Sequence, residues 1–207
     1  MYKVVRKEHL ADVVTLLEVQ APEIAAKAQA GQFVIVRLNE TGERIPLTLS
    51  DWNPLIGTIT IIFQHAGRST QELALVREGQ EIRDVVGPLG KPTEIEVYGN
   101  VVCIGGGVGI AVMHPITKAL KEAGNHIVSI IGARDKSLLI LEDSMREVSD
   151  ELYVTTDNGS YGRPGFVINV LEDLIQEGRK IDLVFAIGPV PMMKAVSDLT
   201  KKHSIKT

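Results

Sequence analysis

The sequence contains a single cysteine, Cys103, among its 207 residues. One thiol excludes an internal disulfide framework and any metal site made of cysteines alone, and the histidines are not spaced like metal ligands. We therefore expect no metal centre and a reducing compartment. No stretch approaches the roughly 20 apolar residues of a membrane span, and Met1–Lys7 lacks the apolar run of a signal peptide. A soluble cytoplasmic protein without membrane contact is expected.

An excess of positive charge is also missing, because the formal net charge is -4. This balance argues against a nucleic-acid partner. Apolar residues make up 44% and charged residues 23% of the chain, which is typical of a globular protein. The sequence shows no internal repeat and no low-complexity segment. Its length suits one large domain or two small ones.

The first half of the chain consists of short, closely spaced apolar runs. They are Phe33–Leu38, Ile59–Gln64 and Glu81–Val86, with turn residues such as Gly57 between them. This spacing predicts an antiparallel sandwich or barrel. One short helix is expected at Thr70–Arg77.

The second half alternates buried strands with helices. The strand candidates are near-continuous apolar runs at Val101–Ile104, His126–Gly132, Glu151–Thr155 and Leu183–Ile187. Such runs are typical of a parallel sheet covered on both faces by the intervening helices. The change of rhythm places the domain boundary after Tyr98, giving domains 1–98 and 99–207.

A glycine-rich turn follows the first of these strands. Its residues are Gly105, Gly106, Gly107, Val108 and Gly109. A strand, a glycine turn and a helix form the setting in which backbone can approach a pyrophosphate closely, because no Cβ blocks the ligand. The spacing departs from G-x-G-x-x-G, so a connection without a ligand stays open as an alternative.

Polar residues and glycines follow the other predicted strands as well. Arg134 comes after the second strand, Asp157 after the third and Gly188 after the fourth. Ligands of open α/β sheets lie outside the carboxyl ends of the strands. Each end is a turn in its own right, but together they favour one shared cleft.

Several strings resemble the ferredoxin–NADP reductase superfamily. They are Gly42–Thr48 (GERIPLT), Gly87–Gly90 (GPLG), Thr156–Arg163 (TDNGSYGR) and Gly188–Met192 (GPVPM). The resemblance covers nearly the whole sequence and implies an N-terminal flavin-binding β-barrel and a C-terminal nicotinamide-binding α/β domain. It is particularly similar to two kinds of electron-transfer subunit. One belongs to dihydroorotate dehydrogenase B, and the other is the small subunit of NADH-dependent ferredoxin:NADP oxidoreductase, also described as a sulfide dehydrogenase subunit.

The resemblance implies FAD in the barrel domain. The implied contacts are Arg44 and Gly67, Ser69 and Thr70 at the phosphates, Pro46, Leu47 and Thr48 along the isoalloxazine, and Ile62, Phe63 and Gln64 on a second edge. Thr48 is the candidate catalytic residue, as a hydrogen-bond partner near flavin N5. Leu47 stands where the superfamily usually has a stacking tyrosine. Arg44 as a solvated loop charge, and Gly67–Thr70 as a helix cap, remain the alternatives from the residues alone.

For the second domain the resemblance implies NAD(H) or NADP(H). The implied contacts are Gly105, Gly106, Gly107, Val108, Gly109, Arg134, Asp157, Gly188, Pro189 and Met192. An acidic residue after the second strand favours NADH, but Arg134 and Asp135 are adjacent and point in opposite directions. The family likeness favours NADH.

The implied function is that of an FAD-dependent NAD(P)H oxidoreductase subunit. It would pass electrons between NAD(P)H and an iron–sulfur or ferredoxin partner by hydride transfer from nicotinamide C4 to flavin N5. The partner would be ferredoxin or a larger catalytic or flavin/iron–sulfur subunit, in a hetero-oligomer or a homodimer. The alternatives are the electron-transfer subunit of dihydroorotate dehydrogenase B and, from another class, a non-catalytic module that senses nucleotide redox state.

Relatives of this kind usually carry a C-terminal [2Fe–2S] module. Such a cluster needs four thiolates, which Cys103 alone cannot supply. We therefore expect the cluster in a C-terminal segment missing from this sequence, and favour a fragment over a cluster-free variant.

Overall fold

The computed structural model describes all residues, Met1–Thr207. The chain divides into two compact units, Met1–Glu94 and Ile95–Thr207, called the N-terminal and C-terminal units below. The division lies at Glu94, whereas the change in sequence rhythm places it after Tyr98.

The N-terminal unit is built around one antiparallel sheet. Its elements are β1 (Tyr2–Ala11), β2 (Val14–Gln20), α1 (Pro22–Ala25), β3 (Phe33–Arg37), β4 (Ile45–Asn53), β5 (Thr58–Gln64), α2 (Arg68–Ala74), β6 (Glu81–Ile82) and β7 (Asp84–Leu89). The strand order is β6-β1-β2-β5-β4-β3-β7.

The sheet curls into a nearly closed barrel because its two edge strands are neighbours in the chain. Only Arg83 separates β6 from β7. β6 pairs with β1 and β7 pairs with β3, so both edges of the sheet must lie within one residue of each other. The Arg83 amide also donates to the carbonyl oxygen of Leu38, at 3.1 Å. Closure removes the exposed edges that an open sheet would leave.

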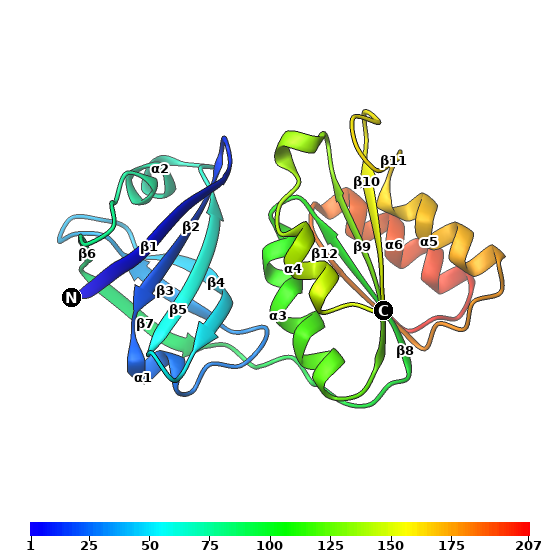
Figure 1. Cartoon of the computed structure of the whole chain (residues 1–207), viewed down its shortest axis with the longest axis horizontal. Helices are drawn as coiled ribbons and strands as arrows, with labels where there is room; N and C mark the ends of the chain where they lie inside the picture. The colour runs from blue at the N-terminus through cyan, green and yellow to red at the C-terminus, as the bar shows by residue number, and fades with distance from the viewer. The chain divides into compact units, whose positions relative to one another are not determined.

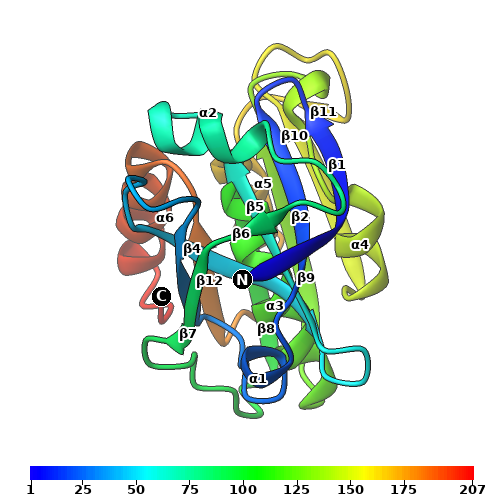
Figure 2. The ribbon, with the colours of Figure 1, turned by 90° about the vertical axis from the view of Figure 1, so that its left-hand side faces the viewer.

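Alternating side chains fill the barrel. Leu17, Leu49 and Ile61 are fully buried and belong to one apolar cluster. The two short helices add Ile24 from α1 and Leu73 from α2 to that cluster. They lie at opposite ends of the barrel (Figures 1 and 2).

The C-terminal unit is a parallel sheet between two helical layers. Its elements are β8 (Asn100–Gly106), α3 (Gly109–Glu122), β9 (His126–Ala133), a 3-10 turn η1 (Lys136–Leu138), α4 (Glu142–Glu147), β10 (Glu151–Thr156), β11 (Arg163–Pro164), α5 (Val167–Gln176), β12 (Leu183–Ile187) and α6 (Val190–Lys202). The order is β11-β10-β9-β8-β12. Helices α3 and α4 cover one face, and α5 and α6 cover the other (Figure 1).

Helix α3 shows why the sequence folds this way. Met113, Ile116 and Leu120 recur at helical spacing and are buried against the sheet. Gly124 follows the helix with a φ of +97°, a left-handed conformation that glycine adopts without a Cβ penalty. The predicted fold class, an antiparallel barrel followed by a parallel α/β sheet, is confirmed.

Three local predictions differ from the structure. The run Glu81–Val86 is two strands, because Arg83 turns the chain from one barrel edge to the other. The helix after β5, α2, begins at Arg68, two residues before the predicted start at Thr70. The N-terminal hairpin of β1 and β2 was not among the predicted strands.

None of the helices combines the length and the apolar character that a membrane span requires. No three His, Cys, Asp or Glu side chains are grouped to hold a metal ion.

One buried hydroxyl gives a test of the packing in the C-terminal unit. Thr155 is 1% exposed, and its Oγ1 has no hydrogen-bond partner. An unpartnered buried polar group costs about 1–3 kcal/mol. We expect Thr155→Val to leave the free energy of unfolding unchanged or to raise it by up to about 2 kcal/mol.

The matched control is Thr117→Val. Thr117 is also fully buried, but its Oγ1 donates to the Met113 carbonyl oxygen at 3.0 Å. This variant should lose stability, by about 1 kcal/mol. Denaturant unfolding measures both, and an equal loss in the two variants would contradict the assignment.

Candidate flavin and nucleotide sites

Strand β4, which carries the predicted flavin contacts Pro46, Leu47 and Thr48, presents alternate residues to opposite sides. Ile45, Leu47 and Leu49 pack against the barrel core. Pro46 is exposed and Thr48 is half-buried, so these two occupy the outward side, as strand periodicity requires. The Thr48 hydroxyl makes no hydrogen bond to another residue, which leaves it free for a ligand. Leu47 therefore could meet a flavin only through its backbone.

The neighbouring strand β5 repeats this division. Phe63 is 3% exposed and lies in the barrel core. Ile62 and Gln64 are on the opposite side, where Gln64 is exposed. Leu49 on β4 pairs with Ile61 on β5, so the outward residues of the two strands lie next to one another. Of the six strand residues predicted at the flavin, four share the outward side.

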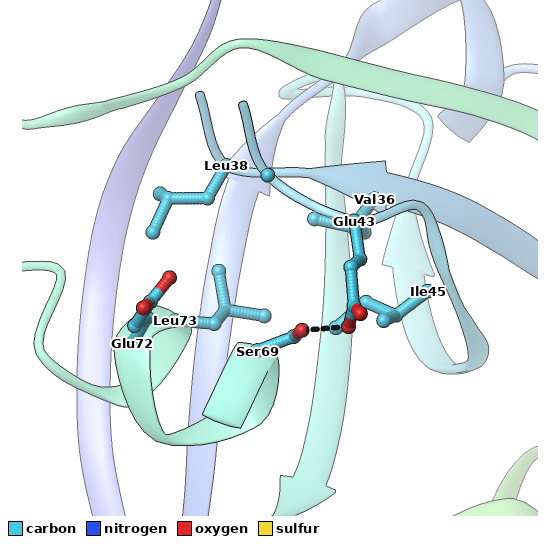
Figure 3. Close-up of a pocket in the computed structure, with 8 residues that line it drawn as sticks. Val36, Leu38, Glu43, Ile45, Ser69, Glu72 and Leu73 are labelled. Carbon is cyan, nitrogen blue, oxygen red and sulfur yellow. Dashed lines mark hydrogen bonds between the residues drawn. The ribbon is translucent and has the colours of Figure 1, made fainter. Parts of the chain in front are cut away.

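The predicted phosphate residues come from two segments that the fold brings together. Ser69 of α2 donates a hydrogen bond to Glu43, which precedes Arg44 in the β3–β4 loop (Figure 3). Arg44 is exposed and forms no ion pair, whereas eight of the other nine arginines do. An unpaired guanidinium on the loop that contacts the Ser69 hydroxyl suits an anionic ligand.

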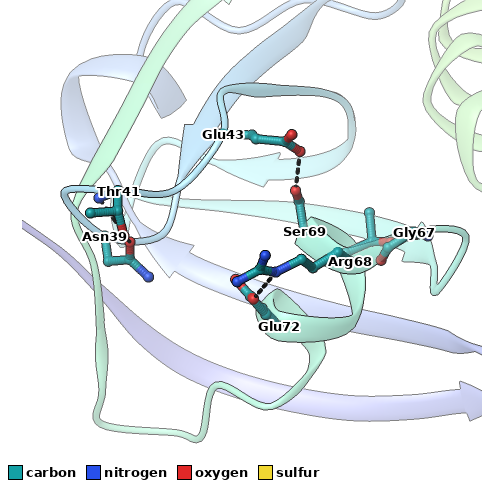
Figure 4. A network of polar contacts seen from close by, with 8 residues as sticks. Asn39, Thr41, Glu43, Gly67, Arg68, Ser69 and Glu72 are labelled. Atoms are coloured by element: carbon teal, nitrogen blue, oxygen red, sulfur yellow. Dashed lines mark hydrogen bonds and ion pairs between the residues drawn. The ribbon is translucent and has the colours of Figure 1, made fainter.

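The first turn of α2 is partly occupied by its own capping bonds. The Gly67 amide donates to Thr70 Oγ1 at 3.1 Å, and the Thr70 hydroxyl donates to the Gly67 carbonyl oxygen at 2.9 Å. Arg68 pairs with Glu72 at 2.8 Å (Figure 4). Thr70 is therefore engaged within the helix, and Ser69 is the hydroxyl of this segment that faces the β3–β4 loop.

In the C-terminal unit, the glycines of the turn have different structural tasks. A Cβ on Gly109 would fall on the carbonyl oxygen of Ile187, and a Cβ on Gly105 would lie 3.0 Å from Ile110. These two glycines allow α3 to start close to the sheet. Gly107 differs, because it has a φ of +55° and no atom within 4 Å of its Cβ position. Open space above left-handed backbone is where a phosphate could approach.

The carboxyl edge of the sheet carries further glycines in register. Gly106 pairs with Gly132 of β9, and a Cβ on Gly188 would lie 3.1 Å from the Gly106 Cα. Met192 of α6 fills the space over Gly106, where a Cβ would meet its Sδ at 2.5 Å. The structure thus brings the glycine turn together with Gly188, Pro189 and Met192 at one edge.

At the next strand end, Asp135 is fixed by a local hydrogen-bond pair. Its Oδ1 accepts from the Ser137 amide at 3.1 Å and from the Ser137 hydroxyl at 2.5 Å. The Ser137 hydroxyl lowers the pKa of Asp135 below its ordinary value. Arg134 is exposed and reaches Asp135 Oδ2 at 3.3 Å, while Asp157 is exposed at the end of β10. One carboxylate and one guanidinium therefore stand side by side at this edge.

Cys103 lies inside the sheet, away from any ligand. It is fully buried, and burial raises the pKa of its thiol to about 12. It is neither nucleophilic nor available to a metal in that state.

Sequence reasoning missed three residues of these regions. Glu43 was not considered because its contact with Ser69 spans 26 residues of chain. The glycine at position 132 was read as the end of a strand, although its lack of a side chain admits Val167 of α5. The capping role of Asp135 could have been found from the Asp135-x-Ser137 spacing, which is typical of a side-chain cap.

No family model matches the chain. A dihydroorotate dehydrogenase B (NAD(+)) electron transfer subunit homolog of Thermotoga maritima is 49% identical over 192 residues, covering 93% of this chain and 67% of the relative. The chain belongs to the family of dihydroorotate dehydrogenase B electron-transfer subunits and their homologues. An uncharacterized protein of Clostridium beijerinckii is 42% identical over 215 residues, covering 100% of this chain and 73% of the relative.

Solved structures agree with this membership. The NADH-dependent reduced ferredoxin-NADP oxidoreductase matches with a TM-score of 0.90 at 47% identity, covering 99% of this chain and 72% of that chain. A cytochrome P450 reductase of Amycolatopsis matches at 18% identity with a TM-score of 0.81, covering 99% and 66%, which shows the shared fold. The predicted superfamily resemblance is confirmed. The chain spans about two thirds to three quarters of the length of its curated relatives.

The two kinds of glycine in the turn predict opposite outcomes for the same substitution. Gly109→Ala should destabilise the C-terminal unit by about 2 kcal/mol or more, because its Cβ meets backbone that cannot move aside. Gly107→Ala should cost only about 1–2 kcal/mol of backbone strain but weaken dinucleotide binding at least tenfold. Thermal unfolding and nucleotide titration separate the two effects. Equal loss of stability in both variants would contradict the division.

Proposed function

We propose that this chain is the flavin- and nicotinamide-binding part of an electron-transfer subunit, an FAD-dependent NAD(P)H oxidoreductase. The observation that carries the proposal is a likeness that runs through both units at once. The NADH-dependent reduced ferredoxin-NADP oxidoreductase covers 99% of this chain at 47% identity. A shared fold alone would not argue function, but here 47% identity accompanies the shared fold over both units.

The N-terminal unit would hold FAD. Pro46 and Thr48 on the outward side of β4 would lie along the isoalloxazine, and the Leu47 amide backbone would lie between them. Arg44 and Ser69 would contact the phosphates. Thr48 supports this role because its hydroxyl is half-buried and makes no other hydrogen bond, so it can donate or accept at the flavin edge.

The C-terminal unit would hold the dinucleotide. Gly107 offers open backbone at the start of α3, and the amides of Val108 and Gly109 donate no backbone hydrogen bond. Free amides at the start of a helix favour a pyrophosphate. Gly188, Pro189 and Met192 would border the nicotinamide end, and Arg134 and Asp157 would border the far end of the ligand.

The cofactors supply the redox chemistry, which is hydride transfer between nicotinamide C4 and flavin N5. The residues of the chain bind and orient them, and no acid–base pair is required. Cys103 is the sole cysteine and is buried, so an iron–sulfur acceptor would be held outside these 207 residues.

We propose NADH as the preferred nicotinamide. The Thermotoga maritima relative carries NAD(+) in its name, and the solved oxidoreductase is named for both NADH and NADP. In this chain, the ionised Asp135 stands at the end of β9, where a carboxylate can accept from a ribose hydroxyl and repels a 2′-phosphate. The adjacent Arg134 is held at its Nε by the same carboxylate.

The test is rapid-mixing reduction of the FAD-reconstituted protein by each nucleotide. We expect the flavin absorbance to bleach with NADH, and at least about tenfold more slowly with NADPH at equal concentration, an energetic difference of about 1.4 kcal/mol. Failure to take up FAD, or a flavin that neither nucleotide reduces, would refute the proposed function. Uptake of FAD without reduction would favour the non-catalytic sensing module.

The Thr48 hydroxyl can be tested separately. Thr48→Val keeps the shape and removes the hydrogen bond, and we expect about tenfold slower flavin reduction with FAD affinity changed less than about threefold. Thr48→Ser should restore most of the rate. A slow Ser variant would show that the methyl group, and not the hydroxyl, matters at this position.

A second candidate is the electron-transfer subunit of dihydroorotate dehydrogenase B, which the Thermotoga maritima relative supports through its name. The cofactors are the same and the partner differs. Purification of the native complex would decide between a dihydroorotate dehydrogenase and a large glutamate-synthase-like subunit.

A further inference from the structure

The β3–β4 loop holds an acidic side chain at the place proposed for the flavin phosphates. Ser69 Oγ donates to Glu43 Oε2, and both groups are exposed (Figures 3 and 4). Below the contact lie the apolar side chains of Val36, Leu38, Ile45 and Leu73, around a volume of about 10 Å³. That space is no larger than a single water molecule needs. The Ser69 hydroxyl has one proton to donate, so a ligand that accepts it must replace the Glu43 carboxylate as the acceptor.

Some of the charged side chains around this contact form ion pairs and others do not. Glu43 has no ion-pair partner, and the neighbouring Arg44 has none either. Arg68 lies within electrostatic reach of Glu43 but is paired with Glu72. The Glu43 carboxylate therefore accepts a hydrogen bond from the neutral Ser69 hydroxyl, although the next residue, Arg44, carries an unpaired guanidinium.

We propose that Glu43 competes with the flavin phosphate for the Ser69 hydroxyl and so sets the affinity of the site for phosphate-bearing flavins. The inference rests on the proposed flavin site. On binding, Ser69 exchanges the carboxylate for a phosphate oxygen as its hydrogen-bond acceptor. The displaced carboxylate moves toward solvent, because two anions cannot share one donor at close range without repulsion. Arg44 is then the cation left beside the phosphate.

The proposal predicts a gain of affinity on removing a charge. Glu43→Gln should bind FAD about tenfold more tightly, a modest effect that suits an exposed pair of charges. Riboflavin has the same ring system without a phosphate, so its affinity should not change. The gain for FAD should shrink as ionic strength rises, because salt screens exposed charges.

The experiment is a titration of the flavin-free protein with FAD and, separately, with riboflavin. Glu40→Gln is the matched control, because Glu40 belongs to the same loop and pairs with Arg83 at 2.7 Å instead of meeting Ser69. This variant removes the same net charge. It should leave both affinities within about twofold, because salt screens the interaction between the exposed Glu40 carboxylate and the bound phosphate. Thermal unfolding of each variant confirms that the barrel is intact.

A gain for FAD alone in Glu43→Gln supports the proposal. An unchanged FAD affinity, an equal gain for riboflavin, or weaker FAD binding overturns it, and the last result would make Glu43 a ligand contact instead. Any of these leaves the proposed function standing as long as the wild-type protein takes up FAD. A wild-type protein that binds no FAD overturns both.

Discussion

The C-terminal unit depends on the absence of side chains along one edge of its parallel sheet. Three helices begin there, and each lies so close to the sheet that a Cβ at the contact would collide, whether on the strand or on the helix. Gly109 starts α3 against the Ile187 carbonyl, Gly106 accepts Met192 of α6, and Gly132 accepts Val167 of α5. Close helix–strand packing is one of the recognised tasks of glycine in dinucleotide folds. At the same edge of the sheet, where glycines allow the helices to pack closely, Gly107 has open space that a ligand can occupy.

This division of labour explains why the glycine turn is informative although its spacing is irregular. A motif counted by spacing treats all its glycines as equivalent, whereas only one of them here has free space around it. The remaining glycines are required by the protein's own packing and would be needed without any ligand. Binding and folding therefore use neighbouring residues for different reasons, and a substitution in the motif has to be interpreted position by position.

Much of the fold could be predicted because its signals are local. The apolar runs around Val101 and Leu183 mark buried strands, and the stripe of Met113 and Leu120 marks a helix. The hairpin of β1 and β2 was missed because β1 has a single buried residue, Val4, and its pairing with β2 is interrupted by bulges. The division of Leu47 and Phe63 from Thr48 follows from two-residue periodicity and was within reach of the sequence. The contact of Glu43 with Ser69 was not, because it depends on how a loop and a helix meet across the barrel end.

A single residue, Arg83, connects the two edge strands that close the barrel, and this connection affects how the barrel folds during synthesis. β1 opens the sequence, yet its second neighbour, β6, lies at Glu81–Ile82. During synthesis the first strand must wait with one edge unpaired until almost the entire N-terminal unit has left the ribosome. Pairings between such distant segments are slow to form, because the chain entropy of a long loop is lost before the contacts compensate. The C-terminal unit meets the same constraint, because β8 at Val101 pairs with β12 at Leu183. In each unit one strand edge therefore stays open to edge-to-edge association until the last strand of its sheet has been made.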